Sequence, residues 1–214
     1  MIDVEQSTAR PLVLACGALA ADLRAVLAAS GFDAHVVVEY LPANLHNRPE
    51  LIAPALRPRL VAAADAGRPV FVAYADCGTG GGLDALLGDF PGVQRLPGAH
   101  CYEVFAGAEQ FAALQEEELG TFYLTDFLAK HFDALVWSGL GLDRHPELRD
   151  LYFGAYTRVV LLSQAADAAL VERARAAAAR LGLELFHRPT GRDRLGAPVL
   201  AHLDHRATHS APAR

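Results

Sequence analysis

Short apolar runs alternate with helical stretches along this chain, and this alternation constrains the fold more than any other feature. Runs such as residues 11–15 (PLVLA), 34–40 (AHVVVEY) and 69–74 (PVFVAY) are followed in turn by stretches with apolar residues at helical spacing. Continuous apolar strands are typical of parallel sheets buried on both faces, and parallel strands need helical crossovers. The pattern predicts an α/β fold: an open, mostly parallel sheet with helices on both faces, as in a Rossmann-like three-layer sandwich.

The remaining elements are predicted from apolar periodicity and from residues that start or end helices. Further strands are predicted at residues 93–96, 158–162 and 183–187. Helices are predicted at residues 18–29, 49–65, 83–87, 108–118, 125–134, 146–153 and 167–181.

The sequence predicts one domain with flexible termini. Its 214 residues suffice for one substantial core, and no Pro/Ser/Gly-rich linker divides them. Residues 1–10 are polar and predict a flexible N-terminus, and residues 11–190 are predicted to form the α/β metal-site domain. Apolar periodicity is lost after Arg188, so residues 191–214 are predicted to be a disordered tail.

Charge and cysteine usage exclude several classes of protein. The formal net charge is −6 without a basic stripe, which argues against nucleic-acid or anionic-membrane partners. The expected partner is a small-molecule substrate. The apolar stretch 11–29 is interrupted by Asp22 and Arg24, so it predicts neither a signal segment nor a membrane span. Three cysteines are too few for a disulfide framework. We expect a cytoplasmic protein whose cysteines bind metal or act in catalysis.

Four potential metal ligands follow four successive predicted strands. Cys16 comes directly after the first strand, His46 lies in the loop after the second, and Cys77 and Cys101 follow the third and fourth. Carboxyl ends of parallel strands share one edge of a sheet, where ligands bind. Thiolates and neutral imidazole are zinc ligands, and three cysteines can also hold an iron–sulfur cluster. We expect one metal site here, with zinc favoured over a cluster and His100 as the alternative to His46.

Glycines and carboxylates flank the predicted ligands. Gly78, Gly80 and Gly81 open the stretch after Cys77, where free backbone N–H groups at a helix start favour an anionic ligand or cofactor. Asp76 and Glu103 are candidates for catalytic proton transfer. The alternatives are that both carboxylates cap helices or are solvated, and that a cysteine is an inert core residue. The glycine run lacks the Lys-Ser/Thr of a P-loop and does not match G-x-G-x-x-G.

A set of short motifs carries a resemblance to a known family. The motifs are Leu14-Ala15-Cys16-Gly17-Ala18-Leu19, Leu45-His46-Asn47-Arg48-Pro49, Asp76-Cys77-Gly78-Thr79-Gly80-Gly81, His100-Cys101-Tyr102-Glu103 and Gly141-Leu142-Asp143. Together, over residues 11–190, the chain resembles the bacterial and archaeal family known as domain of unknown function 1638. That family has no assigned activity, but its members are often encoded near corrinoid proteins and their methyltransferases. The resemblance therefore implies a corrinoid protein as a partner, and a metal-held substrate thiolate as the acceptor of a methyl group.

Three functions remain open on the sequence. The first is a zinc-dependent enzyme that activates a thiol or water for group transfer. The second is an iron–sulfur lyase or redox enzyme that uses the same three cysteines. The third is a non-catalytic accessory protein that handles a metal or corrinoid, for which a closed site with four protein ligands would be typical.

Overall fold

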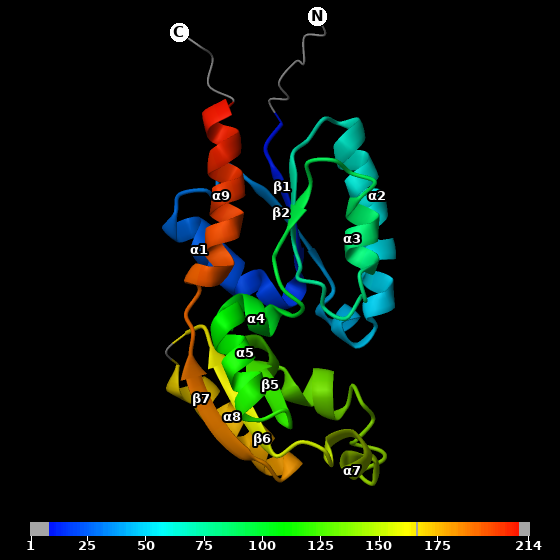
Figure 1. Cartoon of the computed structure of the whole chain (residues 1–214), viewed down its shortest axis with the longest axis vertical. Helices are drawn as coiled ribbons and strands as arrows, with labels where there is room; N and C mark the ends of the chain where they lie inside the picture. The colour runs from blue at the N-terminus through cyan, green and yellow to red at the C-terminus, as the bar shows by residue number, and fades with distance from the viewer. Residues whose placement is uncertain (1–8, 166, 210–214) are drawn as a thin grey trace, which may run out of the picture. The chain divides into compact units, whose positions relative to one another are not determined.

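The computed structural model describes residues 9–165 and 167–209 (Figure 1). Contacts divide the chain into two compact units. The first unit comprises the chain up to His100 together with the segment from Leu195 onward, and the second unit comprises Cys101–Arg194.

The first unit contains a four-stranded parallel sheet in the order β2-β1-β3-β4. Its strands are β1 (Leu12–Cys16), β2 (Val37–Leu41), β3 (Val70–Ala73) and β4 (Gln94–Arg95). Its helices are α1 (Ala20–Ala29), α2 (Ile52–Asp65), α3 (Gly82–Leu87) and most of α9 (Asp193–His209), with 3-10 turns at Gly17–Leu19, Ala43–Asn47 and Pro49–Leu51. Figure 1 shows α2 and α3 on one side of this sheet and α1 and α9 on the other.

Side chains along each strand point alternately to the two faces of this sheet, and helices cover both faces. Leu12, Leu14 and Cys16 of β1 pack with apolar residues of α2 and α3. On the opposite face, Phe71 of β3 stacks against His202 of α9 at 5.3 Å between ring centroids. Both faces therefore need apolar side chains, which is why the strands read as unbroken apolar runs.

The second unit has a three-stranded parallel sheet in the order β5-β6-β7. Its strands are β5 (Thr121–Thr125), β6 (Arg158–Ser163) and β7 (Glu184–Pro189). Its helices are α4 (Cys101–Ala106), α5 (Ala108–Glu117), α6 (Asp126–Lys130), α7 (Leu148–Phe153) and α8 (Ala168–Leu181), with a π-helical turn at Asp133–Trp137. Val159 and Leu161 pack with α6 and α8, whereas Val160 and Leu162 pack with α4 and α5. This sheet is also buried on both faces.

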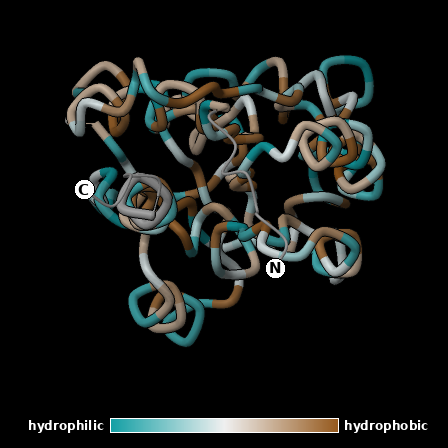
Figure 2. Tube along the Cα trace, turned by 90° about the horizontal axis from the view of Figure 1, so that it is seen from above, coloured by the Kyte–Doolittle hydropathy of each residue, from teal (hydrophilic) through white to brown (hydrophobic). Residues whose placement is uncertain are grey.

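The C-terminal segment corrects one prediction. Residues 193–209 form α9, so the disordered tail predicted over residues 191–214 is wrong for most of its length. Leu195, Val199 and Leu203 are buried at helical spacing, and Gly196 lies against Val26 of α1. Seen end-on in Figure 2, α9 carries hydrophobic residues on one side and hydrophilic residues on the other. Alanine, histidine and charged residues between these positions hide the periodicity in the sequence.

The predicted α/β class, with parallel strands flanked by helices, is confirmed, and the strands form two sheets in place of one. Most of the predicted flexible N-terminus, residues 1–8, lies outside the described residues. None of the described helices is long and apolar enough to cross a bilayer.

Candidate functional site

The strand order of the first sheet identifies where a ligand site belongs. From β1 the chain crosses to β2 on one side, and β3 lies on the other side of β1. This arrangement is a topological switch point, and in doubly wound sheets ligands bind outside the carboxyl ends of the strands at that point. Cys16, the last residue of β1, and Cys77, in the loop after β3, flank it.

Strand register brings Cys16 next to Tyr74. Ala15 of β1 is paired with Ala73 of β3, so Cys16 and Tyr74 are the next residues along two neighbouring parallel strands. Both side chains belong to the face covered by α2 and α3. After Cys16 the chain turns tightly at Gly17, where a Cβ atom would lie 2.8 Å from the Leu41 carbonyl oxygen. Only glycine allows this approach to the end of β2.

The Tyr74 hydroxyl is buried against the two thiols of the first unit. Tyr74 is 2% exposed, and its hydroxyl makes no hydrogen bond of regular geometry. Burial is the main cause that raises the pKa of Tyr74, and the neighbouring Cys16 and Cys77 raise it further. The phenol therefore remains protonated and can donate its proton to a nearby acceptor. A buried donor without a well-placed acceptor costs up to about 1–3 kcal/mol, so a better acceptor than the neutral Cys16 thiol would stabilise this hydroxyl.

The Cys16 thiol is neutral in this environment. Burial is the largest cause, and it raises the pKa of Cys16; the Ala18 backbone N–H and the Tyr74 hydroxyl act in the opposite direction. Those two donors stabilise the thiolate without fully offsetting its desolvation. A cation that binds here would supply the missing stabilisation of the thiolate.

After β3 the backbone at Cys77 adopts the left-handed conformation. Cys77 has φ +51°, and Gly78 follows with φ +82°. A left-handed conformation is uncommon outside glycine and carries a small energetic cost. Hydrogen bonds from the N–H groups of Asp76 and Cys77 to the carbonyls of Gly98 (3.1 Å) and Ala99 (2.7 Å) hold the strand-end loop in this form.

The Asp76 carboxylate organises the glycine loop. It accepts hydrogen bonds from the Thr79 hydroxyl (2.5 Å) and from the N–H groups of Gly80 (3.1 Å) and Gly81 (3.0 Å). These bonds, the Thr79 bond first, lower the pKa of Asp76. The prediction that the Gly80 and Gly81 N–H groups are free for an anionic ligand is therefore wrong, because Asp76 uses them. The same contacts favour the capping alternative for Asp76 over proton transfer.

Asp76→Ala is expected to destabilise the protein by about 1 kcal/mol at neutral pH, through lost hydrogen bonds at a partly exposed site. Because the folded-state pKa is lowered, this stabilisation is present above the ordinary Asp value of about 3.9 and is lost as pH falls through the folded pKa. The difference in melting temperature between variant and wild type should stay constant from about pH 8 to 5 and shrink below about pH 4. The exposed Asp65→Ala serves as control, and a difference that already shrinks near pH 6 would contradict this role.

Two histidines approach one another at the same edge of the first sheet. His46 lies in the 3-10 turn Ala43–Asn47 that follows β2. Burial first, and then the nearby His100, lower the pKa of His46. Its imidazole is therefore neutral at physiological pH, which is the form that binds metal ions.

Arg95 places a guanidinium near the Cys77 loop. It forms a bidentate pair with Asp84 of α3, at 2.6 and 2.8 Å, and donates to the Leu96 and Gly98 carbonyls. The Asp84 bond is the first cause that raises the pKa of Arg95, and Asp76 and Cys77 also contribute. Arg95 thus fixes the loop before His100 and adds positive potential beside Cys77.

The structure brings the predicted site residues together only in part. Cys16 ends β1, whereas His46 and Cys77 lie in the segments that follow β2 and β3, all at the carboxyl edge of the first sheet. Cys101 and Glu103 belong to the first turns of α4, at the start of the second unit, where Cys101 directly follows His100 in the chain. Within residues 9–165 and 167–209, no group of three or more His, Cys, Asp or Glu side chains is arranged to hold a metal ion. The four-residue ligand set stays a prediction.

Sequence reasoning missed Tyr74 and Arg95. Tyr74 ends the apolar run 69–74 and reads as a core aromatic residue. Its polar role depends on the register of β1 and β3, which no local pattern gives. Arg95 lies in a two-residue strand, and its partner Asp84 is eleven positions away.

The protein is therefore a parallel α/β protein with two cysteine thiols at the topological switch point of its first sheet. The model of the family described as protein of unknown function (DUF1638) matches residues 40–197, and the chain belongs to this family. The match includes His46, Cys77 and Cys101, whereas Cys16 precedes it. No curated protein and no solved structure matches the chain.

Proposed function

We propose that this protein is a cytoplasmic metal-dependent enzyme in which Cys16 and Cys77 bind one zinc ion for group transfer. His46, or His100 beside it, supplies the imidazole ligand. Cys101 remains the third predicted thiolate and is tested by its own variant. The observation that carries the proposal is the buried Tyr74 hydroxyl, which faces both thiols and has no regular acceptor.

The donors fit a thiophilic ion in their chemistry. Thiols and a neutral imidazole form the donor set of zinc, and zinc-bound thiols are deprotonated. A thiolate at Cys16 would be a stronger acceptor for the Tyr74 phenol than the neutral thiol beside it in this structure. Tyr74 would then be a positioning residue that orients the sulfur by a charge-assisted hydrogen bond.

The remaining groups hold the site in shape. Asp76 fixes the loop that presents Cys77, and Arg95 supplies positive potential beside it. Zinc bound here would act as a Lewis acid and hold a substrate thiol or water as a nucleophile. Transfer of a methyl group from a corrinoid protein is the reaction that the family resemblance favours, and a small thiol is the proposed acceptor.

Tyr74→Phe tests the observation that carries the proposal. In metal-free protein the variant should be as stable as the wild type or up to about 1 kcal/mol more stable, because a buried unsatisfied hydroxyl is removed. Its zinc affinity should fall about tenfold, because the thiolate loses a donor worth about 1.4 kcal/mol. Chemical denaturation and competitive zinc titration measure the two effects.

Tyr40→Phe is the matched control for this experiment. The Tyr40 hydroxyl, on β2, is also buried without a regular hydrogen bond, and Tyr40 is not among the proposed ligands or their contacts. Its removal should leave zinc affinity unchanged. Equal zinc affinities of wild type and Tyr74→Phe would contradict the role of the Tyr74 phenol.

A further inference from the structure

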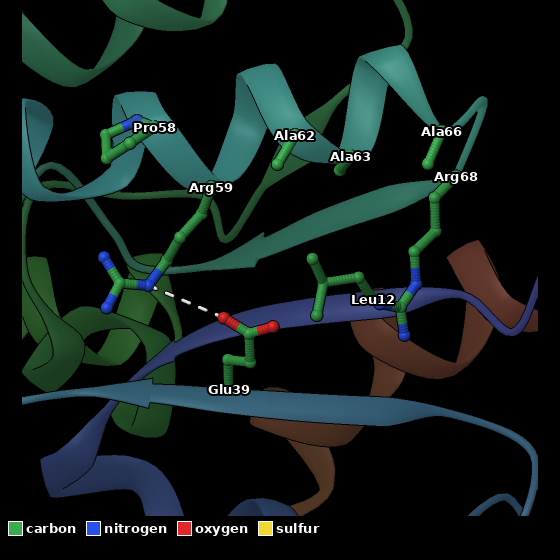
Figure 3. Close-up of a pocket in the computed structure, with 8 residues that line it drawn as sticks. All are labelled: Leu12, Glu39, Pro58, Arg59, Ala62, Ala63, Ala66 and Arg68. Carbon is green, nitrogen blue, oxygen red and sulfur yellow. Dashed lines mark ion pairs between the residues drawn. The ribbon is translucent and has the colours of Figure 1, made fainter.

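A hollow of about 320 Å³ lies in the first unit between α2 and the strands β1 and β2 (Figure 3). It is lined by Leu12, Glu39, Pro58, Arg59, Ala62, Ala63, Ala66 and Arg68. The hollow exists because Ala62 and Ala63 near the end of α2, and Ala66 directly after it, have side chains too short to fill the space above these strands. None of its lining residues belongs to the proposed metal site.

The polar groups of this hollow carry a surplus positive charge. Glu39 and Arg59 form an ion pair at 3.5 Å across it, marked by the dashed line in Figure 3. Arg68 donates from Nε to the Arg10 carbonyl at 2.6 Å, which anchors its guanidinium. Among the described residues, no carboxylate forms an ion pair with Arg68. The Arg68 guanidinium lies beside Leu12, and its terminal nitrogens point away from α2 (Figure 3).

The rest of the lining is apolar. Leu12 lies on the strand side, and Pro58, Ala62 and Ala63 lie on the helix side. Small ligand pockets are mostly apolar, with a few placed polar groups that fix orientation. An anchored guanidinium at one end of such walls recognises a carboxylate or a phosphate, both of which match its fork of donors.

We propose that this hollow binds a small anion with a short aliphatic body, the anionic group on Arg68 and the chain along Leu12 and the alanines. The volume is near the lower end of ordinary ligand pockets, which limits the body to a few carbon atoms. The Glu39–Arg59 pair borders the hollow away from Arg68. The hollow contains none of the proposed metal ligands, although its Arg59 acts electrostatically on Tyr74, so the two proposals are tested with separate variants and separate ligands.

Calorimetric titration of the full chain tests the site with four probes: hexanoate, hexyl phosphate, acetate and inorganic phosphate. The six-carbon probes should bind at least about tenfold more tightly than the head groups alone, because only they contact the apolar walls. Tighter binding of hexanoate identifies a carboxylic acid as the ligand class, and tighter binding of hexyl phosphate identifies a phosphate ester. Either result supports the site.

Two kinds of variant locate the binding. Arg68→Gln should weaken binding about tenfold or more by removing the cation. Ala62→Leu should block the hollow, whereas Ala64→Leu, exposed on the same helix and outside the lining, should not. Ala62 is itself exposed, so its variant stays a valid test if Arg68→Gln does not fold. Absence of binding to wild type, or equal binding by wild type and Ala62→Leu, would overturn the proposal.

Discussion

Protein carrying Cys77→Ser should bind less than about a tenth of the zinc bound by wild type, for which we expect about one ion per chain. Serine is close in size but replaces a soft thiolate by a hard hydroxyl that is not ionised at neutral pH. Cys16→Ser should have the same effect, and Cys101→Ser tests the third predicted thiolate. Elemental analysis after anaerobic purification and zinc loading measures the result.

The control for this series is His35→Asn, which removes an exposed histidine of the first unit from outside the proposed site. It should retain the full zinc content. Zinc content unchanged in both Cys16→Ser and Cys77→Ser would remove the proposed site altogether. Iron with equivalent sulfide in the anaerobic wild type, in place of zinc, would support the iron–sulfur alternative on the same cysteines.

Val199→Asp should destabilise the protein by about 4 kcal/mol or more, because the Val199 side chain is 0% exposed and a carboxylate there would be buried without a partner. For a chain of this length, that cost lowers the melting temperature by roughly 10 °C or more. The expectation follows from α9 being part of the first unit's core. Thermal denaturation followed by circular dichroism measures it.

Ala201→Asp is the matched comparison, two residues along the same helix and exposed. It should change stability by less than about 0.5 kcal/mol. Similar melting temperatures for Val199→Asp, Ala201→Asp and the wild type would show that α9 does not pack on the first unit, and would restore the prediction of a disordered tail.

Apolar runs with β-branched residues predicted most of the strands, and their carboxyl ends predicted where the candidate site lies. The apolar run at residues 158–162 predicted a strand, and it forms most of β6, which is buried on both faces. In contrast, β5 was not predicted, because its apolar stretch between Thr121 and Thr125 is only three residues long. Helix α9 was missed because Pro198 lies inside it and its buried residues are spread over several turns.

The division of the strands into two sheets also lies beyond local patterns. Strand pairing is set by tertiary packing, and the Pro97-Gly98 turn signal near the boundary at His100 does not by itself indicate a change of sheet. The order of elements along the chain predicted Cys16, His46 and Cys77 at one edge. It could not predict that Tyr74 faces the thiols, because that contact depends on how the strands pair. The glycine loop was misjudged because its N–H groups are used by Asp76, a contact within the loop itself.

X-ray absorption at the zinc edge of the zinc-loaded protein reports directly which atoms surround the ion. The proposed site should give at least two sulfur neighbours at about 2.3 Å and an imidazole nitrogen at about 2.0–2.1 Å. A coordination shell made only of oxygen and nitrogen atoms would contradict it, because zinc would then lie away from Cys16 and Cys77.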